Sequence, residues 1–212
     1  MRLDHVSYAV KHEALADTVQ RFGGELGAAF TDGGRHPHFG TQNFILPLQD
    51  NMYIEVVAAL EHPAAERAPF GQAVRQRAES GGGWLGWAVS VPDITPFESR
   101  LGREAVRGHR RRPDGYELAW RQIGVIDLID DPQLPFFIHW DSPVDQHPSR
   151  GGAGVRISKI EIAGEAERVA DWLGEPSNHP LDAIDVDWVS PDDASGIVSI
   201  TFETASGSVH LD

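Results

Sequence analysis

The chain has 212 residues, 41% of them hydrophobic and 24% charged, and it includes six Trp and nine Phe. This composition is typical of a folded soluble protein and excludes a disordered or collagen-like chain. There is no Cys, which excludes disulfide scaffolds, thiol catalysis and thiolate metal sites. A net charge of −14 would repel a nucleic-acid backbone, so we expect no nucleic-acid partner.

The apolar runs are short. None approaches the roughly 18 residues that a membrane span requires, and the N-terminal residues become charged too early for a secretory signal. We therefore expect a cytoplasmic protein with no membrane partner.

The first sixty residues predict a strand, a helix and three further strands. Residues 3–10 (LDHVSYAV) are rich in β-branched and aromatic side chains, and the helical pattern of residues 12–26 ends beside glycines. A glycine-rich segment follows, and then NFILPL and NMYIEVVAAL predict two strands separated by a turn at Gln49 and Asp50.

The same order returns later in the chain. We interpret residues 61–83 as a linker that contains a helix from Gln72 to Glu79, and residues 84–141 as a second βαβββ unit with an Arg-rich turn after its helix. In this second unit, residues 116–129 (YELAWRQIGVIDLI) predict a strand. Residues 155–212 predict a third, shorter unit of βαβ type.

Two βαβββ units placed side by side enclose a cleft. Because side chains alternate across a strand, His5 and Glu55 converge if both face this cleft. In the last strand of the second unit, LPFFIHWD, the prediction gives His139 the register position of Glu55, and Phe137 that of Tyr53.

These features resemble a known superfamily. The repeated units, the histidine in LDHVSYAV and the glutamate in YIEVV resemble the vicinal-oxygen-chelate superfamily. Within it, GGRHPHFGTQN, YIEVV, RPDGYELAW and LPFFIHWD look like the glyoxalase-like domain family. The resemblance covers nearly the whole chain and implies an α+β fold of repeated βαβββ units that form a cleft.

The resemblance also implies a divalent metal (Mn, Fe, Ni, Co or Zn) between the units, held by His5, Glu55 and His139. The fourth ligand position falls near Gly86 or Trp87, whose side chains cannot bind a metal, so an arrangement without any metal stays open.

Each of the three candidate ligands has an alternative interpretation. His5 and His139 also fit strand histidines that are hydrogen-bonded within the core. A carboxylate in the middle of YIEVVAAL requires some partner if it is buried, and an Arg or His partner would satisfy Glu55 as well as a metal would.

The segment GGRHPHFGTQN suggests polar contacts to a substrate from His36 and Asn43 at the edge of the cleft. An ordinary imidazole pKa near 6.5 would make His36 a suitable base or donor. The alternatives are a purely structural turn and a cupin-like HxH motif, but Pro37 disfavours a regular strand there.

The segment from Arg107 to Arg112 is the densest basic run of the chain. It fits a solvated loop, or a loop from which Arg112 reaches the cleft and pairs with a carboxylate or phosphate. We predict Tyr53, Trp120 and Phe137 as further contacts to the substrate.

The leading functional hypothesis is a metal-dependent lyase or isomerase, or a dioxygenase if the metal is ferrous, which acts on a small organic acid or carbonyl compound. The alternative is a metal-free protein that sequesters a small, flat compound, anionic or neutral, as the bleomycin-resistance members of the superfamily do. In a third hypothesis the C-terminal unit caps the cleft or forms the surface of a homodimer.

Overall fold

The computed structural model describes residues 1–112, 114–152, 154–175, 179–190 and 194–212. Its first sixty residues form four strands and one long helix, in the predicted order. The elements are β1 (Arg2–Val10), α1 (Leu15–Leu26), β2 (Thr31–His36), β3 (Thr41–Pro47) and β4 (Tyr53–Ala59).

Local sequence explains how two of these elements end. Helix α1 stops at Gly27, which adopts the left-handed conformation (φ 63°) that glycine accepts without steric cost. The turn from β3 to β4 places Asp50 and Asn51 at φ 59° and 60°, and Asp and Asn tolerate this region better than most other residues.

The segment predicted as a linker is mostly helical. It forms α2 (Pro63–Arg67) and α3 (Pro69–Glu79), and α3 buries Phe70, Ala73 and Val74. Its apolar face packs against β1, β4 and β5 (Gly83–Ser90), so this segment is part of the core.

The second set of strands departs from the prediction at two places. Its remaining elements are α4 (Thr95–Leu101), β6 (Val106–Arg111), β7 (Glu117–Ile123), α5 (Val125–Asp130) and β8 (Phe136–Trp140). The predicted Arg-rich turn is strand β6, and the end of the predicted strand 116–129 is helix α5. Gly124, at φ 102°, separates β7 from this helix.

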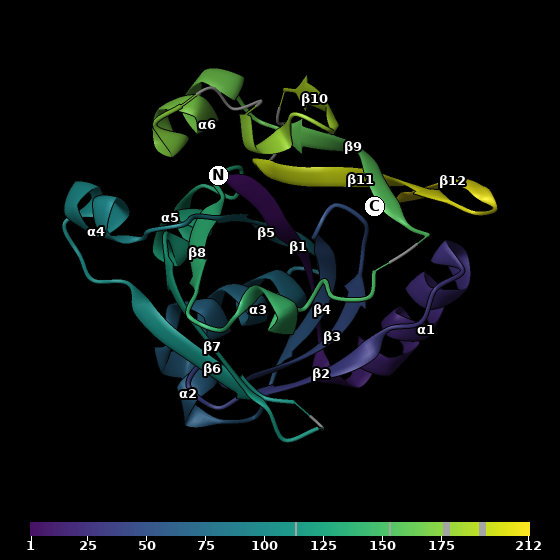
Figure 1. The fold of residues 1–212 in the computed structure, drawn as a ribbon, viewed down its shortest axis with the longest axis horizontal. Coiled ribbons are helices and arrows are strands. Elements are labelled where there is room, and N and C mark those ends of the chain that lie inside the picture. Colours follow the sequence, from purple (N-terminus) through teal and green to yellow (C-terminus); the bar gives the residue numbers. More distant parts are fainter. Residues whose placement is uncertain (113, 153, 176–178, 191–193) are drawn as a thin grey trace.

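These eight strands form one curled sheet in the order β2-β3-β4-β1-β5-β8-β7-β6 (Figure 1). Strand β1 pairs in parallel with β4 and antiparallel with β5, and so joins the two sets of strands. The α+β fold class with repeated strand units around a cleft is therefore confirmed.

The C-terminal residues form a second, four-stranded sheet with one helix. Its elements are β9 (Arg156–Ala163), α6 (Ala166–Leu173), β10 (Asp185–Val189), β11 (Gly196–Thr204) and β12 (Gly207–Leu211), and the strand order is β10-β9-β11-β12. The sheet packs against the curled sheet at the central strand β5 and lies close to the N-terminal end of β1 (Figure 1).

Two hydrophobic cores result from this arrangement. The first joins the curled sheet to α1, α6 and the C-terminal sheet, with Phe22, Trp87 and Phe202 fully buried. The second lies on the other face of the curled sheet, beneath α3 and α5, and includes Phe39, Phe70 and Trp120. This second core surrounds the candidate site. No helix in the described part of the chain is long and apolar enough to cross a membrane.

Candidate functional site

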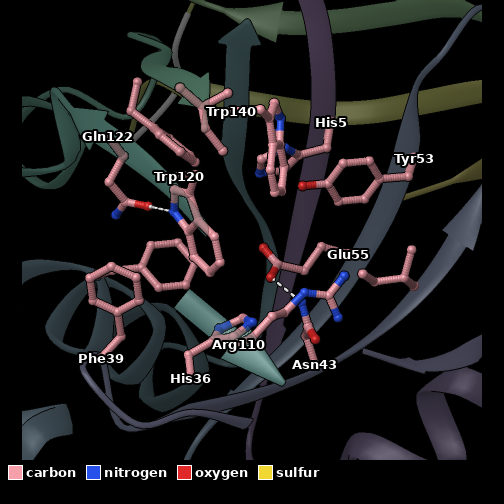
Figure 2. A pocket seen from close by; sticks show the side chains of 14 residues that line it. His5, His36, Phe39, Asn43, Tyr53, Glu55, Arg110, Trp120, Gln122 and Trp140 are labelled. Carbon is pink, nitrogen blue, oxygen red and sulfur yellow. Dashed lines mark hydrogen bonds between the residues drawn. The ribbon is translucent and has the colours of Figure 1, made fainter. Parts of the chain in front are cut away.

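A cavity of about 30 Å³ lies inside the curl of the eight-stranded sheet, next to the second core (Figure 2). Side chains from both sets of strands line it. The polar and charged ones are His5, His36, Asn43, Tyr53, Glu55, Arg110 and Gln122, and the aromatic ones are Phe39, Phe70, Trp120, Phe136 and Trp140.

Glu55 is the buried carboxylate of this cavity, at 4% exposure. Its Oε2 accepts a hydrogen bond of 2.7 Å from the Ser7 hydroxyl, and its Oε1 accepts one of 2.6 Å from the Asn43 amide. Ser7 lies opposite Glu55 on the neighbouring parallel strand, and Asn43 comes from β3. The partner that a buried carboxylate requires is therefore a pair of neutral donors, where an arginine, a histidine or a metal was expected.

His5 reaches the same cavity from β1, and its ring is fixed on one side. Its Nδ1 lies 2.9 Å from Oδ1 of Asp4, and its ring stacks on Tyr53 at a centroid distance of 4.5 Å. Because an ionised carboxylate can only accept, this contact places a proton on Nδ1, so that in the neutral ring the lone pair lies on Nε2. That nitrogen has no hydrogen-bond partner among the described residues.

Asp4 is fully buried and is the centre of a polar network behind the cavity. Its Oδ2 accepts hydrogen bonds from Nε2 of His147 at 3.1 Å and from Nε1 of Trp140 at 3.2 Å, and it forms an ion pair with Arg2. Burial alone would raise the pKa of Asp4, but the hydrogen bonds from His147 and His5 outweigh this effect and hold the pKa well below its ordinary value. Asp4 is therefore an anion at neutral pH.

Arg110 is the buried cation of the cavity, at 4% exposure. It comes from β6, and its Nη1 donates to the carbonyl oxygen of Gly33 on β2. Gly33 has no side chain, and a Cβ there would collide with both Asn43 and Arg110. Among the residues that the structure describes, no carboxylate forms an ion pair with Arg110, and burial lowers the pKa of the guanidinium.

His36 is buried and neutral. Its Nδ1 lies 3.0 Å from the Thr41 hydroxyl, while its Nε2 is buried without a hydrogen-bond partner in the described structure. Burial, followed by the charge of Arg110, lowers the pKa of His36 to about 3. The prediction of His36 as a base rested on the ordinary imidazole pKa, which does not apply here. His36 is therefore a weak base, and its neutral ring can donate or accept hydrogen bonds.

Two tryptophans form the aromatic wall of the cavity. The ring centroids of Trp120 and Trp140 lie 5.6 Å apart, and Nε1 of Trp120 donates to Gln122 at 2.8 Å. Gly108 on β6 leaves the space that the Trp120 ring fills, because a Cβ there would collide with the ring. Tyr53 completes the wall from β4; burial, with the nearby charges of Asp4 and Glu55, raises the pKa of its hydroxyl.

Six of the predicted site residues line this one cavity, namely His5, His36, Asn43, Tyr53, Glu55 and Trp120. The convergence of His5 and Glu55 is confirmed at the level of position, because His5 lies opposite Tyr53, and Ser7 opposite Glu55, in the pairing of β1 with β4.

The prediction for β8 is wrong by one residue. Phe136, Ile138 and Trp140 line the cavity, whereas Phe137 and His139 face the other side of the sheet. The ring centroids of Phe137 and Phe97 lie 4.1 Å apart, and Nδ1 of His139 lies 3.1 Å from the backbone carbonyl oxygen of Val91. A shift of one residue in a strand moves every side chain to the opposite face.

The prediction for Arg112 is also wrong in position. Its guanidinium pairs with Asp114 at 2.6 Å and contacts Gln146 at 3.0 Å, outside the cavity. Arg110, two residues earlier, is the arginine that reaches the cavity. In the structure only Gly108 and Arg110 of β6 are buried, and the sequence VRGHRR carries no signal for this choice.

The expected metal does not fit the side chains that the structure brings together. Two of its three predicted ligands line the cavity, but His139 does not, and both oxygens of Glu55 already accept hydrogen bonds. In the described part of the chain, no group of three or more His, Asp or Glu could hold a metal ion. None of the described residues of 155–212 lines the cavity, so the described part of the third unit does not form the cap that the third hypothesis offered.

Comparisons with known proteins agree with this architecture. A family model described as a glyoxalase-like domain matches residues 3–176. A hypothetical protein from Staphylococcus aureus has the same fold, with a TM-score of 0.70 and 16% identity over 97% of this chain and 92% of that one.

A second solved structure is less similar. Methylmalonyl-CoA epimerase from Mycobacterium tuberculosis has a TM-score of 0.44 and 16% identity over 67% of this chain and 89% of that one. No curated protein matches this chain in sequence.

Proposed function

Because this chain belongs to the glyoxalase-like domain family of the vicinal-oxygen-chelate superfamily, whose expected metal does not fit the cavity, we propose a metal-independent proton-transfer enzyme. Its substrate is a small organic carboxylate with a carbonyl group, and its reaction is of the isomerase type. One observation carries the proposal: a single cavity holds an aspartate-oriented histidine and a buried guanidinium without a carboxylate partner.

The role of Arg110 is to bind the anionic group of the substrate. A buried cation without a directly bound carboxylate is costly, and a carboxylate that enters the cavity supplies both the opposite charge and a planar pair of acceptors. Burial excludes most of the water that would otherwise screen this attraction. The site therefore favours a carboxylate over a neutral compound of the same shape.

His5 is the general base in this proposal. The Asp4 carboxylate keeps the proton on Nδ1, so the lone pair of Nε2 is available to take a proton from the carbon next to the substrate carbonyl. The electron pair of the broken C–H bond then moves to the carbonyl oxygen and forms an enolate. Asp4 is a positioning residue, because it orients the ring and stabilises the imidazolium that forms.

Neutral donors are available for the enolate oxygen. The hydroxyl of Tyr53 keeps its proton because its pKa is raised, and His36 presents a neutral imidazole. A neutral imidazole polarises a carbonyl in other enzymes, and Arg110 adds a full positive charge nearby. Transfer of the proton from the His5 imidazolium to the enolate oxygen gives the enol, which is an isomerisation that needs no other reactant, whereas its return to the same carbon restores the substrate with hydrogen exchange.

Solvent exchange tests the proposal directly. We expect the protein in D₂O to accelerate deuterium incorporation at the carbon next to the ketone of 2-oxobutanoate or phenylpyruvate, followed by proton NMR. His5→Gln should abolish the exchange, Asp4→Asn should shift its pH profile, and the exposed-site control His38→Gln should leave it unchanged. Exchange that disappears with a chelator would contradict a metal-independent reaction.

The aromatic wall of Trp120 and Trp140 favours a second candidate function, the sequestration of a flat anionic compound without turnover. The same samples distinguish the two functions. If carboxylates bind and perturb the indole signals of these tryptophans while no exchange occurs, the protein is a binding protein. If no carboxylate binds, both candidates fail.

A further inference from the structure

The central cavity is too small for a whole ligand. Its volume of about 30 Å³ suits one polar group such as a carboxylate, whereas sites for drug-sized ligands occupy several hundred Å³. The rest of any larger substrate must therefore lie outside the cavity, and the neighbouring surface determines which substrates fit.

A second hollow of about 140 Å³ adjoins the cavity. Phe39, Phe70 and Gln122 line both spaces and so form the boundary between them. From this boundary the hollow runs between the start of α3 and the segment that joins β7 to α5, where Ile123 and Val125 form its walls. The two spaces therefore lie on either side of one short stretch of buried side chains.

The hollow is mostly apolar, with Arg103 and Glu104 as its charged lining residues, and it opens at the surface. Val106 and Ile126 line it and are 36% and 47% exposed, and they are two of the four large hydrophobic residues that are exposed in the described structure. Two of these four therefore gather at the mouth of a hollow that adjoins the cavity of a buried cation. Exposed apolar side chains that cluster in this way mark binding sites more often than isolated ones do.

We propose that this hollow binds the apolar arm of the substrate whose carboxylate lies at Arg110. The substrate class is then an amphipathic carboxylic acid: an anionic head in the cavity, and a short alkyl or aryl arm that passes Phe39, Phe70 and Gln122 and ends between Val106 and Ile126. This inference rests on the proposed carboxylate binding at Arg110, and it assigns residues 106 and 126 to the selection of the arm.

A series of alkanoates tests the arm separately from the head. Acetate, butanoate, hexanoate and octanoate are titrated into the full chain, and the indole signals of Trp120 and Trp140 in two-dimensional NMR report the dissociation constant. Each methylene group that is buried in the hollow should increase affinity about fourfold, which corresponds to about 0.8 kcal/mol.

The variant Val106→Trp narrows the mouth at an exposed strand position. We expect it to leave acetate binding unchanged and to remove the increase in affinity beyond butanoate. Val198→Trp is the matched control, because Val198 is also an exposed strand valine, at 43% exposure, but does not line either space. Ile126→Asp, which lowers affinity only for the longer acids, provides a second variant.

Each outcome decides between the head and the arm. An unchanged dependence on chain length in both Val106→Trp and Ile126→Asp would overturn the inference. Acids that bind with no dependence on length in the unmodified protein would overturn it too, while carboxylate binding at Arg110 would still stand. If no acid of the series binds, the proposed function fails together with the inference.

Discussion

The two sets of strands in the curled sheet contribute different chemistry to one cavity. Strands β1 to β4 supply most of its polar groups, including His5, Asn43 and Glu55, and neighbouring side chains hold His5 and Glu55 in place. Strands β6 to β8 supply an aromatic and aliphatic wall with Gln122 and one ion, Arg110, which has no carboxylate partner in the described structure.

The first set of strands therefore fixes the geometry of the site in advance, and the second set recognises the ligand. The anions of the first set, Asp4 and Glu55, are satisfied within the protein, so they fix geometry and have little capacity left to attract a ligand. The cation of the second set is not satisfied and gains most from a ligand. Substitutions in the first set should therefore cost stability, and substitutions in the second set should cost binding.

Asp4→Asn should have the largest effect on stability, a loss of about 3 kcal/mol in the free energy of unfolding, because the fully buried carboxylate accepts hydrogen bonds from His5, His147 and Trp140. Urea unfolding at pH 7 measures this loss. Asp141→Asn is the control, since its partly exposed ion pair with Arg121 should contribute under about 1 kcal/mol.

The difference in stability between the unmodified protein and Asp4→Asn should depend on pH in a defined direction. The pKa of Asp4 is lower in the folded chain than in the unfolded one, so its contribution is present at neutral pH and is lost only as the pH falls below about 4. A difference between the two proteins that vanished already at pH 6 would contradict this role for Asp4.

Arg110→Met should have the opposite effect to Asp4→Asn, because it should weaken binding more than stability. We expect butanoate to bind about 100-fold more weakly, which corresponds to about 2.7 kcal/mol, because the variant loses the only buried guanidinium among the residues lining the cavity. Its stability should change little, because burial disfavours the guanidinium while the nearby charge of Glu55 favours it. Arg112→Met, on the exposed pair with Asp114, should bind butanoate as the unmodified protein does.

His36 should make stability depend on pH. Its pKa is about 3 in the folded chain and near 6.5 when unfolded, so below pH 6.5 the unfolded chain binds a proton that the folded chain does not. The free energy of unfolding should fall by about 2 kcal/mol between pH 7.5 and pH 5 on this account. His36→Leu should remove that loss, whereas a substitution at the exposed His38 should retain it.

The sequence correctly predicted which residues face the cavity where polar residues recur at every second position of an apolar strand. In β1 and β4, the polar side chains His5, Ser7 and Glu55 identify the face that lines the cavity, and the resemblance to the family agrees with them. In β6 the sequence VRGHRR has no apolar alternation, so only the structure shows that Gly108 and Arg110 face inward.

Strand β8 could not be assigned in this way. It lies between the two cores, so the run FFIHW is apolar toward both faces and carries no alternation that sets its phase. Helix α5 was missed for a related reason, because a short apolar run such as VIDLI fits a buried strand as well as a helix. Tertiary packing determines the register of β8 and the helical conformation of α5. The expected homodimer is a separate point and stays a prediction.

His139→Gln should have the smallest effect and provides the sharpest test of this register. The side chain is partly exposed and contacts the Val91 carbonyl on the face away from the cavity, so its loss should cost about 1 kcal/mol of stability. Butanoate affinity and the exchange of 2-oxobutanoate protons should not change. Ile138→Asn is the matched substitution on the inward face of the same strand, and it should alter both, because Ile138 lines the cavity. The reverse pattern, with activity lost in His139→Gln and retained in Ile138→Asn, would place His139 in the site and restore the three-ligand arrangement.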